Sequence, residues 1–135
     1  MGSRAQVYMK DTGVYLYTHW DSGRLKGIVQ KAIARMERWD DEEYLTRIIF
    51  SEMIKDNIEG ATGYGIGCSK HGDIELLITV KCDSDGYVIV KDMYTNEREI
   101  YSSLNEFIKG SCYIERPNGD SIPGDEETFN DGIGW

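Results

Sequence analysis

An imidazole, an indole, a carboxylate and a guanidinium lie close together near the start of the chain, at His19, Trp20, Asp21 and Arg24. We expect this segment where a strand ends and a helix begins. Such corners can present side chains and free backbone N–H groups to a ligand. With Arg4, these four residues form the predicted ligand-binding site. The structural alternative is that Asp21 caps the helix, Trp20 packs beneath it and Arg24 is solvated.

His19 and Asp21 also have the spacing of part of a facial metal triad, for which His71 is the available second histidine. A short His-x-Asp pair arises easily by chance, and His71 is better explained as part of a turn between two strands. With two histidines and no close cysteine pair, a structural zinc site lacks a full ligand set. We therefore expect no metal and no cofactor.

The other motifs favour structural roles. Gly63, Gly65 and Gly67 alternate within one strand, which indicates close packing against that face and not a dinucleotide loop. Residues 83–86 lack the ligands of a calcium loop and are typical of a hairpin turn. The sequence contains none of the common motifs of a serine nucleophile or a P-loop. Cys68 and Cys82 fall in alternating segments, where a cysteine is most often a small buried residue.

Hydrophobic periodicity predicts the order ββααββββα. Strands are expected at residues 5–9, 14–18, 62–68, 74–82, 87–91 and 98–101, with one more possible at 112–115. A first helix has its apolar stripe over residues 25–36, ending at Met36. A second starts at an Asp40–Glu43 capping box, and a third at Ser103. This order predicts an α+β fold, a mainly antiparallel sheet with its helices on one face. The alternative is a half-open barrel plugged by the helix pair.

Length and composition narrow the class of protein. The chain has 135 residues, 40% of them hydrophobic, and a formal net charge of −9. We expect one domain over residues 1–115 and an acidic, partly ordered tail over 116–135, which Phe129, Ile133 and Trp135 could anchor. The negative charge argues against direct nucleic-acid binding. Short apolar stretches and unpaired cysteines indicate a cytoplasmic protein without a membrane partner.

The opening Met1–Arg4, with the aromatic segment Tyr17–Asp21, resembles a group of small proteins from phage, prophage and archaeal genomes. Its members open Met-Gly-Thr/Ser-Arg and reach a His/Tyr-Trp/Phe-Asp-Gly corner before a helix, and Gly86–Val90 is a weaker echo. The resemblance covers about a quarter of the chain. This sequence departs from the group at Ser22–Arg24, where members often have Gly-Tyr-Pro. The resemblance implies a mobile-element setting and a strand–strand–helix opening, and it carries no activity.

Three functions are compatible with these features. The first is a small acidic cytosolic binding or inhibitory protein of a phage or mobile element, acting on a protein or small ligand without turnover; imitation of phosphate charge is a variant of it. The second is a hydrolase or nucleotide-processing enzyme, with His19 as general acid/base, Asp21 orienting it, and Arg4 or Arg24 holding an anion. The third is a structural subunit that forms a homodimer through exposed apolar helix surface.

Overall fold

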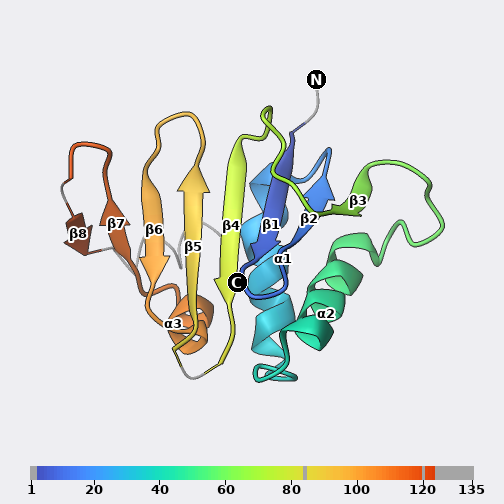
Figure 1. The fold of residues 1–135 in the computed structure, drawn as a ribbon, viewed down its shortest axis with the longest axis horizontal. Coiled ribbons are helices and arrows are strands. Elements are labelled where there is room, and N and C mark those ends of the chain that lie inside the picture. The colour runs from blue at the N-terminus through green and yellow to red at the C-terminus, as the bar shows by residue number, and fades with distance from the viewer. Residues whose placement is uncertain (1–2, 84, 120, 124–135) are drawn as a thin grey trace.

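The computed structural model describes residues 3–83, 85–119 and 121–123 and has three helices beside one sheet (Figure 1). The helices are α1 (Ser22–Ala34), α2 (Glu42–Ile54) and α3 (Leu104–Lys109). The strands are β1 (Ala5–Met9), β2 (Val14–Thr18), β3 (Tyr64–Gly67), β4 (Leu76–Lys81), β5 (Tyr87–Asp92), β6 (Arg98–Tyr101), β7 (Tyr113–Glu115) and β8 (Ser121–Pro123). The predicted α+β class and the order ββααββββα are confirmed.

The sheet has eight strands in the order β3-β2-β1-β4-β5-β6-β7-β8. Only the β1–β4 pair is parallel among the described pairs. The connection between these two strands runs through β2, α1, α2 and β3, which is long enough for a parallel arrangement. All the other described pairs are antiparallel. With β3 and β8 at its two edges, the sheet is open. The half-open barrel alternative is therefore wrong.

The core lies between the sheet and its helices. Alternate residues of β1, Ala5, Val7 and Met9, are fully buried, as the period of two predicts for one covered face. They belong to the same hydrophobic cluster as residues from all three helices, among them Leu25, Val29, Leu45, Ile49 and Phe107. The helices thus share one face of the sheet.

Several local expectations differ from the structure. The first helix ends at Ala34, and Met36 lies beyond it with a positive φ of 57° and a 64% exposed side chain, so it is not part of the buried stripe. The cap of α2 is Asp41, one residue after the expected Asp40. Cys82 is buried as expected, whereas Cys68 is exposed just after β3. In both helix errors the periodicity located the element and misplaced its end, because turn geometry decides where a helix stops.

The C-terminal region contains one strand that the sequence pattern did not indicate. Residues 121–123 form β8, which pairs antiparallel with β7 and extends the sheet into the predicted tail. The proposed anchors Phe129, Ile133 and Trp135 lie outside the described residues. Within the described ranges, no helix is both long and apolar enough to cross a bilayer.

Candidate functional site

The predicted corner between β2 and α1 is held by a buried threonine. Thr18 is the last residue of β2 and is fully buried. Its Oγ1 accepts hydrogen bonds from the backbone N–H groups of Trp20, at 3.3 Å, and Asp21, at 3.2 Å. A threonine hydroxyl that accepts from amides two and three residues later stabilises a tight turn. Thr18 therefore fixes the direction in which the next side chains leave the corner.

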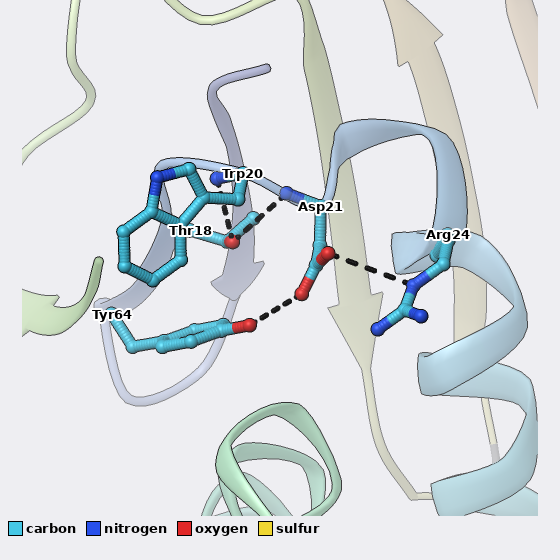
Figure 2. Close-up of polar contacts among 5 residues, drawn as sticks. All are labelled: Thr18, Trp20, Asp21, Arg24 and Tyr64. Carbon is cyan, nitrogen blue, oxygen red and sulfur yellow. Dashed lines mark hydrogen bonds and ion pairs between the residues drawn. The ribbon is translucent and has the colours of Figure 1, made fainter. Parts of the chain in front are cut away.

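Asp21 does not cap α1 with its side chain, although it occupies the N-cap position. Its Oδ2 instead accepts a short hydrogen bond from the Tyr64 hydroxyl, and its Oδ1 lies 3.6 Å from Arg24 Nε (Figure 2). Partial burial, followed by the contact with Asp21, raises the pKa of the Tyr64 phenol. The phenol thus stays protonated and donates to the carboxylate.

Trp20 packs against the entry to β3. The built Cβ of an alanine at residue 63 would overlap the indole of Trp20, and Gly63 has a positive φ of 94°. The indole also meets the Tyr64 ring edge-on at a centroid distance of 5.8 Å (Figure 2). The Trp20 side chain remains 50% exposed. Close packing was expected for all three glycines of residues 63–67, but only Gly63 has it: nothing lies within 4 Å of a Cβ added at Gly65 or Gly67.

The other two predicted site residues face different partners. His19 Nδ1 lies 3.2 Å from the Tyr17 hydroxyl, and the Tyr17 ring stacks on His71 with centroids 4.7 Å apart. Arg4 Nε lies 3.4 Å from Asp73 in the β3–β4 loop. Of the five predicted residues, Trp20, Asp21 and Arg24 are linked through Tyr64 and the Asp21 carboxylate. His19 joins them through an edge-on contact of its ring with the Trp20 indole, at a centroid distance of 6.1 Å, whereas Arg4 is paired with Asp73.

A metal triad of His19, Asp21 and His71 does not form. Asp21 is engaged by Tyr64 and Arg24, while both histidines contact Tyr17. Within the part of the chain that the structure describes, no group of three or more histidine, cysteine or acidic side chains could hold a metal ion.

A groove adjoins the corner along one side of α1. We name it the α1 groove; it has a volume of about 680 Å³. Its lining comes from α1, from the C-terminal end of α2 and the residues that follow, and from Tyr64 and Ile108. The residues on α1 are Gly23, Arg24, Gly27, Ile28, Gln30, Lys31 and Ala34, and those from α2 onward are Glu52, Met53, Lys55, Asp56 and Asn57. Arg24 and Tyr64 thus belong both to the Asp21 contacts and to the groove.

One residue of the groove lining, Gln30, has a buried side-chain amide with an unused acceptor. Gln30 is only 3% exposed, and its Nε2 donates to the carbonyl of Phe107 at 2.9 Å. Its Oε1 accepts no hydrogen bond within the described ranges. Because this oxygen has almost no accessible surface, it lies behind the lining of the groove and is not offered to its open space.

The cysteines offer no activated thiol in the interior. Burial, followed by the neighbouring Glu42 carboxylate, raises the pKa of the Cys82 thiol to about 12. Burial, followed by Glu99, raises the pKa of Cys112 to about 11. Both thiols are therefore protonated at neutral pH, which disfavours a nucleophilic role.

Thr18, Tyr64 and Gln30 were not identified as site residues from the sequence. Thr18 could have been found from the sequence, because a threonine whose hydroxyl accepts from the backbone N–H groups two and three residues later is a recognised local motif. Tyr64 lies 43 residues from Asp21 and Gln30 lies 77 residues from Phe107. No local pattern reports contacts over such separations.

Comparison of the chain with protein-family models, curated proteins and solved structures finds no match. The functional argument therefore depends on the site itself.

Proposed function

We propose that this chain is a small cytoplasmic binding protein that holds a small molecule in the α1 groove without turnover. The observation that carries the proposal is the groove itself. Its volume of about 680 Å³ lies within the range of small-ligand sites, and its lining combines aliphatic side chains such as Ile28, Met53 and Ile108 with charged and polar ones. Arg24 and Tyr64, tied to Asp21, supply polar groups at one part of its lining.

The hydrolase alternative has less support from the contacts. A general acid/base that Asp21 orients would need His19 and Asp21 to share a hydrogen bond, and no such bond joins them in the described part of the chain. His19 is also absent from the lining of the α1 groove. A cytoplasmic location fits the three free cysteines, and origin in a mobile element rests on the resemblance of the N-terminal segment.

Ligand-observed NMR on the full chain, with a library of small anionic, neutral and cationic compounds, tests the proposal. We expect saturable binding that Gly27→Leu abolishes, because a side chain there enters the groove from a position with nothing within 4 Å. Leucine also favours a helix more than glycine does, so this variant should remain folded. Asn105→Leu, at an exposed position of α3, is the control.

Two outcomes would contradict the proposal. One is that no compound binds, and the other is that Gly27→Leu binds the same compounds as the wild type. Chemical conversion of a bound compound over hours would replace the binding role with a catalytic one.

A homo-oligomeric subunit is the second candidate, and the sheet favours it more than the helices do. The face of the sheet opposite the helices carries the stacked pair Tyr8 and Tyr15, with ring centroids 4.5 Å apart, in register with Thr79, Ile89, Ile100 and Tyr113. Tyr113 is 56% exposed. Sedimentation equilibrium distinguishes this candidate: a monomer at all concentrations would reject it.

A further inference from the structure

The strand β3 lies at one edge of the sheet and has an unpaired side (Figure 1). Its register with β2 continues that of the His19–Gly63 pair, in which the N–H of His19 donates to the Gly63 carbonyl. Hydrogen-bonded and non-bonded pairs alternate along an antiparallel ladder, so the backbone groups of Tyr64 and Ile66 point away from β2. Within the described ranges no strand lies on that side of β3. These N–H and C=O groups can therefore pair with an added strand.

The β3 edge has none of the features that usually protect an exposed strand. Edge strands are commonly blunted by charged side chains or by proline. The strand at the opposite edge, β8, ends in Pro123, which has no N–H to donate. The sequence of β3 is Tyr-Gly-Ile-Gly, without charge or proline. Its outer side therefore remains suitable for strand pairing.

An apolar side chain accompanies these unpaired backbone groups. Ile66 is in register with Leu16, which is fully buried in the cluster between the sheet and the helices. Directly opposite residues of a ladder point to the same face, yet the Ile66 side chain is 66% exposed. A strand added at this edge would place a side chain opposite Ile66 and cover part of it. An apolar residue at that position gives the most favourable pair.

The charge around β3 identifies a second copy of the chain as a suitable partner. Two copies that each have a formal net charge of −9 repel over most of their surface. Residues 60–72, which include β3, contain no aspartate or glutamate, and Lys70 is their one lysine. Lys70 follows Ile66 by four positions, so in an antiparallel pair centred on Ile66 the two lysines lie at opposite ends. The local charges therefore do not oppose the contact.

We propose that two copies of this chain associate through their β3 edges, in an antiparallel pair centred on Ile66. The two Ile66 residues exchange N–H···O=C hydrogen bonds across a two-fold axis, and their side chains contact each other. Tyr64 of each copy lies opposite Cys68 of the other. The inference rests on the homo-oligomeric candidate and assigns its interface to the β3 edge, away from the face that carries Tyr8 and Tyr15.

Sedimentation equilibrium of the full chain, from about 1 μM to about 1 mM, tests the inference. We expect a reversible equilibrium between monomer and dimer. Ile66→Pro removes the central N–H at an edge position where proline is tolerated, so it should raise the dimer dissociation constant roughly tenfold or more. Ile66→Val keeps the N–H and most of the apolar surface, and this matched control should dimerise nearly as well as the wild type. Circular dichroism checks that both variants are folded.

Disulfide formation tests the register of the pair without proline. In a Cys68→Ser background, Ile66→Cys should give a disulfide-linked dimer on mild oxidation, because opposite residues of a hydrogen-bonded antiparallel pair have Cα atoms about 5.5 Å apart. Tyr94→Cys in the same background is the control. Tyr94 is 77% exposed and lies between β5 and β6, far along the strand order from β3, so this variant should cross-link much less.

The possible results separate the β3 interface from the candidate on which it rests. If the wild type is a monomer at every concentration, both are wrong. If the wild type dimerises and a folded Ile66→Pro dimerises equally well, the homo-oligomeric candidate stands and the β3 interface is wrong. Cross-linking of Ile66→Cys that is no more efficient than that of Tyr94→Cys would also overturn the inference.

Discussion

The N-terminal ends of α1 and α2 both begin at an aspartate and are built differently. Each helix has 13 residues and an aspartate at its N-cap. Asp41 of α2 accepts a hydrogen bond from the N–H of Tyr44, and Glu42 and Glu43 follow in the first turn. Asp21 of α1 instead contacts Tyr64 and Arg24, and its first turn contains no acid. The acidic groups at the α2 end thus serve the helix itself, whereas the aspartate at the α1 end is used for tertiary contacts.

Each of the two helices also has one buried side chain with an oxygen that accepts no hydrogen bond in the described part of the chain, and the surroundings of these two side chains differ. Glu42 and Gln30 each have one oxygen without a partner in the described ranges. Glu42 Oε2 accepts from the N–H of Thr12 at 2.7 Å, and Glu42 neighbours the buried Cys82. Gln30 lines the α1 groove, and Glu42 does not.

The largest expected effect is on the free energy of unfolding at high pH, and it tests the burial of Cys82 beside Glu42, the first residue of α2. The pKa of Cys82 is raised from its ordinary value of 9.0 to about 12 by burial and by Glu42. Between pH 9 and pH 12 the Cys82 thiol keeps its proton in the folded state and loses it in the unfolded state. This group therefore does not lower the free energy of unfolding below pH 9, and lowers it progressively as the pH rises above 9. The free energy of unfolding should drop by on the order of 4 kcal/mol by pH 12.

Urea titrations from pH 8 to 11 measure this fall, and Cys82→Ala is the control because it removes the titrating group. The explanation fails if the pH dependence of Cys82→Ala is as steep as that of the wild type.

The next largest effect concerns the α1 corner. Gly63→Ala should cost about 3 kcal/mol, because the new methyl group overlaps Trp20 and the backbone has a positive φ. Gly65→Ala, two residues along the same segment, meets nothing within 4 Å and should cost far less. Thermal and urea unfolding of both variants check the difference. Equal costs would show that Trp20 does not hold the corner.

Thr18→Val should cost about 2 kcal/mol, because the N–H groups of Trp20 and Asp21 lose their acceptor in a fully buried position. Thr79→Val, in the middle of β4, is the matched control and should have little effect on the free energy of unfolding. If both variants unfold alike, the Thr18 hydroxyl does not organise the α1 end.

The smallest effect separates the two N-caps. Asp41→Ala should lower the free energy of unfolding by about 1 kcal/mol through loss of the cap, and Asp41→Asn should restore most of it. Urea unfolding measures both. For Asp21→Asn and Asp21→Ala we expect no difference in the free energy of unfolding that comes from capping, because the Asp21 side chain makes no cap hydrogen bond. A rescue by Asn at both sites would remove the distinction between the helices.

Periodicity and local motifs by themselves predicted the order of the elements and the α+β class. The cap at Ser103 and the left-handed Gly110 that closes α3 were also predictable, because both depend on contacts within a few residues. The same reasoning located the corner that carries Trp20, Asp21 and Arg24.

Only the tertiary structure decided which of these side chains face one another. The parallel pairing of β1 with β4 and the placement of β3 beside β2 bring Tyr64 to Asp21, and α3 brings Phe107 to Gln30. These contacts join residues far apart in the chain, and their geometry depends on how the whole sheet is ordered. The α1 groove exists only because α1, α2, Tyr64 and α3 meet there, and no local sequence pattern encodes that meeting.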